Sequence, residues 1–252
     1  MTEPLLTKRL IKDLASLDTP KGRKRTGLFV AEGTKCVCDL LPAFRPRHIF
    51  SGKEWAEQHP DVKTTIVGGH ELSLLTRLQN TPPVIAFFEL PEISGDCLPK
   101  ADKLVLALDT IQDPGNLGTI IRTCDWMGVK TIVASHETVD AFNPKTVQAT
   151  MGALARVKII YTSLELFLTS LPPSTPIYGT FLDGANIYTE KLETSGVLIM
   201  GNEGRGISPE IENKVNRRLT IPSWPPFEPT SESLNVATAT AIALSQFRSR
   251  QF

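Results

Sequence analysis

The residue types that could do chemistry are concentrated in three stretches of the chain. The first, residues 109–128, places Asn116 where it would cap a helix that carries Arg122. A capped helix with one solvated arginine would explain this stretch without any chemistry. The second, residues 201–209, surrounds Glu203 with three glycines in six positions, which lets a backbone approach a ligand closely. A charged residue inside such a turn favours a functional loop over a purely structural one.

The third stretch, residues 220–247, places Ser233 and Asn235 at the start of an alanine-rich helix predicted from Leu234 onward. Packing explains the small, uncharged face of this helix, and that face favours a subunit interface. Packing does not explain why two polar residues, Ser233 and Asn235, lie at the start of an apolar helix. The glycine spacing of residues 201–206 matches neither the dinucleotide fingerprint nor a P-loop, which argues against a nicotinamide- or nucleotide-binding oxidoreductase.

The elements that must position these loops alternate between strand and helix. Near-continuous apolar runs predict a parallel sheet covered on both faces, in a doubly wound α/β domain over residues 103–252. In such sheets, ligands bind beyond the carboxyl ends of the strands, which is where the three stretches begin. The predicted strands are Leu104–Leu108, Thr131–Ala134, Val157–Ile160, Ile177–Phe181, Val197–Met200 and Leu219–Ile221.

A small α/β unit is predicted over residues 1–92, separated from the larger domain by a linker at residues 93–102. The linker is predicted because residues 90–103 hold two prolines, a glycine and five charged side chains. The predicted helices of the small unit are Leu5–Leu17, Gly33–Leu41 and Glu71–Leu78, and its predicted strands are Gly27–Ala31, His48–Phe50, Thr64–Val67 and Val84–Phe88.

A basic cluster, made of Lys21, Arg23, Lys24 and Arg25, lies near the start of this unit. Residues 1–25 hold seven basic and three acidic side chains, a local charge of +4. Such a run is usually a solvated, mobile loop, but it could also neutralise several phosphates of a nucleic acid.

Composition excludes several classes of protein. Lysine plus arginine (27) equals aspartate plus glutamate (27), so no global charge draws the chain to nucleic acid or a membrane. The four cysteines form no Cys-x-x-Cys pair and the four histidines no His-x-x-x-His pair, so we expect reduced thiols, a cytoplasmic location and no metal. No apolar run reaches 18 residues, so we expect no membrane span.

Together, the three stretches resemble the three motifs of the SpoU class of the SPOUT methyltransferases, which methylate RNA at the ribose 2′-oxygen. Order and spacing agree over residues 103–248. The motifs are Asn116-x-Gly118-x-x-x-Arg122-Thr123 with Gly128; Met200-Gly201-Asn202-Glu203-Gly204-x-Gly206-Ile207; and Ile221-Pro222 followed by Ser233-Leu234-Asn235-Val236-Ala237. The N-terminal unit resembles the RNA substrate-binding domain often attached to this class, through Lys24-Arg25-x-Gly27-x-Phe29-x-x-Glu32-Gly33.

The resemblance implies a deep trefoil knot in the C-terminal domain, S-adenosylmethionine bound within the knot, and a homodimer that completes the active site. The implied cofactor-binding residues are Thr180, Met200, Gly201, Asn202, Gly206, Ile221 and Leu234. The implied catalytic residues are Asn116, Arg122, Glu203, Ser233 and Asn235. RNA binding is assigned to Lys21, Arg23, Lys24 and Arg25.

The resemblance also implies a role for each catalytic residue. Arg122 would activate the ribose hydroxyl or, as an arginine that stays protonated, position a phosphate and stabilise the developing alkoxide. Asn116 would orient Arg122, and Glu203 would hold that network together. Ser233 would contact the RNA, and Asn235 would fix the turn of the third motif.

Two questions stay open at this level. The substrate is expected to be ribosomal RNA, with transfer RNA as an alternative, and an RNA-binding assembly protein without turnover is the rival function. Residues 223–232 are longer and richer in proline than the connection found in many relatives, which affects the wall facing the RNA.

Overall fold

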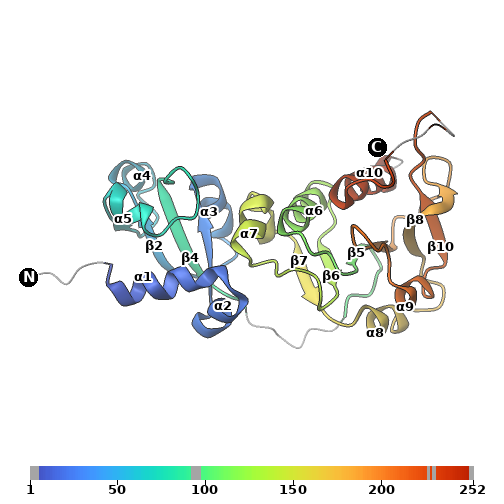
Figure 1. The fold of residues 1–252 in the computed structure, drawn as a ribbon, viewed down its shortest axis with the longest axis horizontal. Coiled ribbons are helices and arrows are strands. Elements are labelled where there is room, and N and C mark those ends of the chain that lie inside the picture. Colours follow the sequence, from blue (N-terminus) through green and yellow to red (C-terminus); the bar gives the residue numbers. More distant parts are fainter. Residues whose placement is uncertain (1–5, 92–97, 226–227, 229–230, 250–252) are drawn as a thin grey trace, which may run out of the picture. The chain divides into compact units, whose positions relative to one another are not determined.

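The computed structural model describes residues 6–91, 98–225, 228 and 231–249. The described residues form two compact units: those of 1–94 pack with residues 140–155, and those of 95–139 pack with those of 156–252 (Figure 1). Residues 140–155 lie within the predicted C-terminal domain in sequence but pack with the N-terminal unit.

The first unit is built on a four-stranded sheet in the order β1-β4-β2-β3, in which β2 and β3 are parallel and the other pairs antiparallel. Its strands are β1 (Leu28–Glu32), β2 (Pro46–Ser51), β3 (Thr65–Ile66) and β4 (Val84–Glu89). Its helices are α1 (Lys8–Ala15), α2 (Pro20–Thr26), α3 (Thr34–Leu40), α4 (Lys53–Gln58), α5 (Gly69–Ser73) and α7 (Pro144–Thr150).

Core residues pack on both faces of this sheet, since alternate residues of each strand point to opposite sides. Val30 of β1 and Phe87 of β4 pack against Leu14 and Leu17 on one side. On the other side, an aromatic cluster joins Phe29, Phe44 and Phe88 to Phe142, whose ring centroid lies 4.9 Å from that of Phe29. Phe142 belongs to the segment 140–155, which therefore completes the core of the first unit.

The helices of the first unit differ in part from those predicted. The helix expected over Leu5–Leu17 begins at Lys8, gives way to a 3-10 turn at Ser16, and Leu5 lies outside the described residues. The helix expected over Glu71–Leu78 ends at Ser73, and α4 was not predicted.

The basic cluster lies on a helix, so the prediction of a mobile loop is wrong. Thr19 caps α2, its Oγ1 accepting from the Gly22 amide at 3.0 Å, and Pro20 occupies the first turn. Gly27 then ends the helix in the left-handed conformation, with φ at 69°.

The second unit is built on a six-stranded, all-parallel sheet in the order β10-β8-β9-β5-β6-β7. Every predicted strand is present, and β8 extends beyond Phe181 to Asn186. Its strands are β5 (Leu104–Leu108), β6 (Thr131–Ala134), β7 (Lys158–Tyr161), β8 (Ile177–Asn186), β9 (Gly196–Met200) and β10 (Arg217–Thr220). Its helices are α6 (Pro114–Trp126), α8 (Leu164–Thr169), α9 (Pro209–Glu212) and α10 (Val236–Ser249).

The helices of the second unit cover the sheet in two groups. Phe167 of α8 and Ile211 of α9 belong to the core that packs on Val105 and Ile199 of the sheet. Helices α6 and α10 lie side by side (Figure 1), and Arg248 Nε near the end of α10 donates to the Met127 carbonyl at the end of α6, at 2.7 Å. No helix in the described part of the chain is long and apolar enough to span a membrane.

Candidate active site

The three sequence motifs meet at one edge of the parallel sheet. They follow β5, β9 and β10, and the carboxyl ends of parallel strands lie at the same edge. This is the edge at which open α/β sheets bind their ligands.

A chain of side-chain hydrogen bonds joins one residue from each motif. Asn116 Nδ2 donates to Glu203 Oε1 at 2.9 Å, and Asn235 Nδ2 donates to Asn116 Oδ1 at 2.9 Å. The Asn116 side chain thus donates one hydrogen bond and accepts another. Glu203 is 87 positions away from it in the sequence, and Asn235 is 119 positions away. Three segments that are distant in sequence are held together here by polar side chains.

Asn116 is free to make these bonds because it does not cap α6, contrary to the prediction. Asp113 caps the helix instead, its Oδ1 accepting from the Asn116 amide N–H at 2.7 Å, and Pro114 fills the first helical position. Asn116 lies in the first turn with its side chain directed at the second motif.

Asn235 has two roles at once. Its Oδ1 accepts from the main-chain N–H groups of Ala237 and Thr238, at 2.9 and 3.2 Å, which caps α10. Its Nδ2 remains to bind Asn116. The start of α10 and the start of α6 are therefore fixed to each other by one amide side chain.

Arg122 lies outside this network, so a role for Asn116 in orienting Arg122 stays a prediction. Six residues of α-helix turn through about 600°, which places Arg122 about 120° around α6 from Asn116. Arg122 is exposed and has no hydrogen bond or ion pair within the described part of the chain. Ser233 is likewise exposed.

The loop of the second motif is folded tightly on itself. A Cβ on Gly201 would lie 2.3 Å from the Gly206 carbonyl carbon and from the Ile207 nitrogen, so only glycine fits there. Asn202 and Gly206 exchange two main-chain hydrogen bonds of 2.9 Å, and Gly206 needs its positive φ of 72° to do so. Asn202 Oδ1 also accepts from the Gly204 amide at 2.9 Å.

The surroundings of this loop fit an adenosine carrying a sulfonium tail. Leu234 is 47% exposed, and Ile221 is half-buried at the end of β10, so apolar surface is available at this edge for a flat ring. Thr180 Oγ1 donates to Met200 Sδ at 3.7 Å, joining β8 to β9. A Cβ on Gly206 would meet nothing within 4 Å, which leaves the loop backbone open to a ligand.

The basic cluster divides into buried and exposed members. Arg23 is 2% exposed and cannot contact RNA, which corrects the prediction. Its Nε and Nη2 donate to Asp140 Oδ2 at 2.8 and 2.6 Å, and its Nη1 donates to the Leu17 carbonyl at 2.7 Å. Arg25 pairs with Asp13 at 2.8 Å, whereas Lys21 and Lys24 are exposed.

Two residues that were not predicted hold the second motif in place. Asp109 and Thr110, directly after β5, hydrogen-bond to Ser208 and Asn202 respectively. The available signal was a carboxylate that immediately follows a wholly apolar strand, at the edge where ligands bind.

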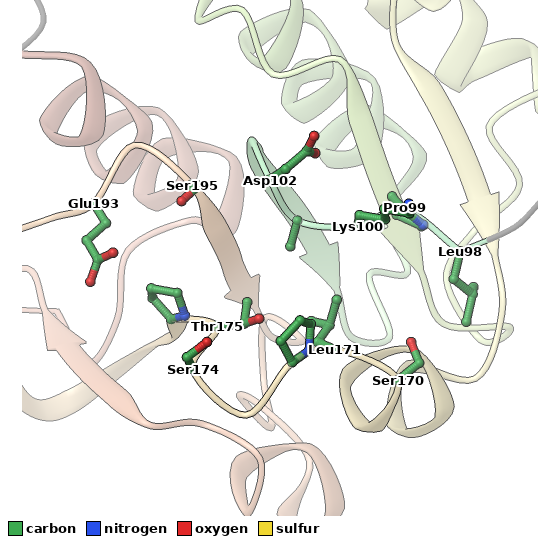
Figure 2. A pocket seen from close by; sticks show the side chains of 13 residues that line it. Leu98, Pro99, Lys100, Asp102, Ser170, Leu171, Ser174, Thr175, Glu193 and Ser195 are labelled. Carbon is green, nitrogen blue, oxygen red and sulfur yellow. The ribbon is translucent and has the colours of Figure 1, made fainter.

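A cavity of the second unit lies at the other edge of the sheet. It has a volume of about 600 Å³ and is lined by residues that precede β5, β8 and β9, among them Lys100, Asp102 and Thr175 (Figure 2). The amino ends of parallel strands are remote from the motif loops, so this cavity is not part of the site. The described residues contain no group of three or more His, Cys, Asp or Glu side chains that could hold a metal ion.

Comparisons with known proteins place this geometry in a family. Residues 103–245 match the SpoU rRNA Methylase family, and residues 8–86 match the MRM3-like substrate binding domain. The 23S rRNA (guanosine(2553)-2′-O)-methyltransferase RlmP of Bacillus subtilis is 32% identical over 94% of this chain and 95% of its own.

Solved structures agree with the sequence relatives. The AdoMet-bound rRNA methyltransferase from Sinorhizobium meliloti is 31% identical, with a TM-score of 0.84 over 98% of this chain and 97% of that chain. A TrmH-family protein from Porphyromonas gingivalis is 37% identical, with a TM-score of 0.85 over 98% of this chain and 100% of that chain.

These matches confirm three predictions made from the motifs: the α/β fold class, the enzyme class of RNA 2′-O-ribose methyltransferase, and S-adenosylmethionine as cofactor. One residue of each motif, Asn116, Glu203 and Asn235, is joined to the others at one edge of the sheet. The chain belongs to the SpoU rRNA methylase family.

Proposed function

We propose that this protein methylates the 2′-oxygen of one ribose in ribosomal RNA, with guanosine as the first nucleoside to test. The observation that carries the proposal is the hydrogen-bonded chain Glu203–Asn116–Asn235, which joins all three motifs. The choice of RNA is supported by the relatives from Bacillus subtilis and Acinetobacter baylyi, both named as 23S rRNA guanosine 2′-O-methyltransferases.

S-adenosylmethionine, when bound, supplies an electrophilic methyl group on a sulfonium. The ribose hydroxyl is a poor nucleophile, so the protein has to polarise its oxygen and align it for in-line attack. The guanidinium of Arg122 supplies a positive charge that holds an RNA phosphate and stabilises the developing alkoxide. Ser233, exposed beside Asn235, contacts the RNA, and the loop of Gly201–Ile207 together with Thr180, Ile221 and Leu234 holds the cofactor.

The active site requires two chains in this proposal, with Arg122 of one chain reaching the Glu203–Asn116–Asn235 network of the other. Its support is the 120° separation of Asn116 and Arg122 around α6, given above. Trp126 on the same helix is 87% exposed, a large apolar surface for a monomer to leave in water. A trefoil knot formed by the C-terminal segment is part of the same proposal.

RNA binding is assigned to the first unit and methyl transfer to the second. Lys21 and Lys24 are exposed on α2 and can each neutralise a phosphate, and Arg25 can contribute when it leaves Asp13. We further propose that the enzyme works in the cytoplasm and without a metal.

The direct test is methyl transfer from labelled S-adenosylmethionine to total RNA from a strain lacking the gene, followed by mapping of 2′-O-methyl sites. Label at one ribosomal RNA nucleotide supports the proposal. Label confined to transfer RNA would show that transfer RNA, and not ribosomal RNA, is the substrate. Cofactor binding without transfer to naked RNA or to ribosomal subunits would favour a binding protein that lacks turnover.

Mixed dimers test the placement of Arg122. Arg122→Ala and Asn116→Ala should each abolish transfer alone while keeping cofactor binding. Co-expressed at equal levels, the two variants should regain about one quarter of wild-type activity, because half of the dimers carry one intact site of two. Failure to regain activity in a preparation shown to contain mixed dimers would place Arg122 in its own chain's site.

A further inference from the structure

The turn directly after β5 holds an unusual backbone in place with side chains. Thr110 has φ at 60°, a conformation that is unfavourable for a β-branched residue. All three of its polar groups are bonded: its N–H donates to Ser135 Oγ at 3.0 Å, its hydroxyl donates to Asp109 Oδ1 at 3.1 Å, and its carbonyl accepts from Asn202 Nδ2 at 2.8 Å. Strained residues of this kind persist where neighbouring structure overdetermines them, often at functional sites.

Asp109 binds the same loop from its other oxygen. The side chain is 5% exposed, and its Oδ2 accepts from the Ser208 main-chain N–H and from Ser208 Oγ, both at 2.7 Å. The two consecutive residues Asp109 and Thr110 therefore hold the loop of the second motif at two points, Ser208 directly after it and Asn202 near its start.

The loop between those two points needs such support. It contains two glycines, Gly204 and Gly206, and glycine loses more conformational freedom on ordering than any other residue. A loop already held in its binding conformation binds its ligand without that entropic cost. The same loop carries Glu203, whose position decides whether Asn116 is held.

We propose that Asp109 and Thr110 are positioning residues of the methyl-transfer site, which keep the Gly201–Ser208 loop in the shape that binds S-adenosylmethionine. This inference rests on the proposed function. Neither residue touches the reacting atoms in this proposal; both act through the loop.

The test is Asp109→Asn in the full-length protein. One Asp109 oxygen accepts from Thr110 and the other from Ser208. An amide nitrogen that replaces either oxygen cannot accept, so Thr110 or Ser208 loses its acceptor. The KM for S-adenosylmethionine, and its Kd by calorimetry, should rise about tenfold. At saturating cofactor, kcat should return to within about threefold of wild type and the KM for RNA should stay unchanged, because bound cofactor restores the loop.

Ser51→Ala is the matched control, because Ser51 is fully buried in the first unit and its Oγ bonds Thr64 at 3.0 Å. This variant should lose stability without any change in cofactor affinity. If Asp109→Asn does not fold, Ser208→Ala should raise the cofactor KM about threefold, because it removes the Ser208 hydroxyl that donates to Asp109.

Two results would overturn the inference. One is an unchanged cofactor Kd in a folded Asp109→Asn or Ser208→Ala protein, and the other is a loss of kcat that saturating cofactor does not cure. Failure of the proposed function would look different, because the wild-type protein itself would then not bind S-adenosylmethionine or not transfer its methyl group.

Discussion

At the scale of single residues, neighbouring members of the basic cluster do different work. Arg23 is buried against Asp140, and Lys24 faces solvent. Removing one partner of a buried ion pair leaves an unpaired polar group, whereas an exposed lysine contributes mainly long-range attraction to phosphate.

We predict opposite outcomes for these two substitutions. Arg23→Ala should lower the free energy of unfolding by roughly 2 kcal/mol, because Asp140 and the Leu17 carbonyl lose their donor. Lys24→Ala should leave stability within about 0.5 kcal/mol and weaken RNA binding, with a smaller salt dependence. Thermal unfolding and RNA titrations at two salt concentrations measure both, and weaker RNA binding by a fully stable Arg23→Ala protein would contradict the assignment.

A second residue-scale prediction concerns acid stability. Burial alone would raise the pKa of Asp125 on α6, but hydrogen bonds from Arg156 at 2.8 Å and Lys130 at 3.1 Å lower it below its usual value. The stabilisation is therefore present above the ordinary aspartate pKa of about 3.9, and it is lost as the pH falls through the lower pKa of the folded state.

Asp125→Asn should accordingly lower the free energy of unfolding by about 1 kcal/mol at pH 7. The difference from wild type should shrink as the pH falls below about 4, because the wild-type carboxylate then becomes protonated. Denaturant unfolding at several pH values tests this. A difference that grows toward acid would show that the two basic partners do not lower this pKa.

At the scale of elements, the start of α10 shows how one side chain can serve structure and catalysis separately. Asn235→Asp keeps the oxygen that caps the helix and loses the Nδ2 donor to Asn116. The rate of methyl transfer should fall about tenfold, while the unfolding temperature stays within a few degrees of wild type. A control, Asn235→Ala, should lose about 1 kcal/mol of stability as well as activity. An Asn235→Asp protein with wild-type turnover would remove Asn116 from the mechanism.

The strands and the edge carrying the site could be predicted from the sequence because short apolar runs have few alternatives. The central strands β5, β6 and β9 are buried on both faces, and β5 and β6 have the predicted bounds. The helix cap of α6 was mispredicted because Asp113 and Asn116 are both good capping residues, and only the loop geometry chooses between them.

Long-range pairing was not predictable in the same way. The burial of Arg23 depends on Asp140, which is 117 residues away, and no local pattern distinguishes Arg23 from Lys24. The Glu203–Asn116–Asn235 bonds depend on the order of strands in the sheet, so the motif resemblance indicated these residues without showing which of them touch.

At the scale of the whole molecule, the first unit is assembled from two separate parts of the chain. Phe142 completes its aromatic cluster, Asp140 neutralises Arg23, and Gly152 packs so tightly against Asp39 that a Cβ would lie 2.4 Å from the Asp39 Cβ. The sequence match to a substrate-binding domain ends at residue 86, well before this segment.

We therefore predict that a fragment ending at residue 91 is not stably folded. Phe29 and Phe44 would lose a packing partner and Arg23 its carboxylate, and such losses add up to a large part of the stability of a small domain. Near-ultraviolet circular dichroism and thermal unfolding should show no cooperative transition. Full-length Phe142→Ala should fold but unfold at a lower temperature, and a cooperatively folded fragment would show that residues 140–155 are dispensable.

The late position of residues 140–155 has a consequence for synthesis of the protein. Ribosomes add about 5–20 residues per second, so the roughly 50 residues between the end of β4 and Phe142 take several seconds to appear. During that time the nascent first unit holds two phenylalanine rings, Phe29 and Phe44, and the side chain of Arg23 without their partners. The rate of translation through α6 and β6 therefore sets how long the incomplete first unit is exposed to chaperones and to premature contact with RNA. The sheet of the second unit is not yet complete at that stage.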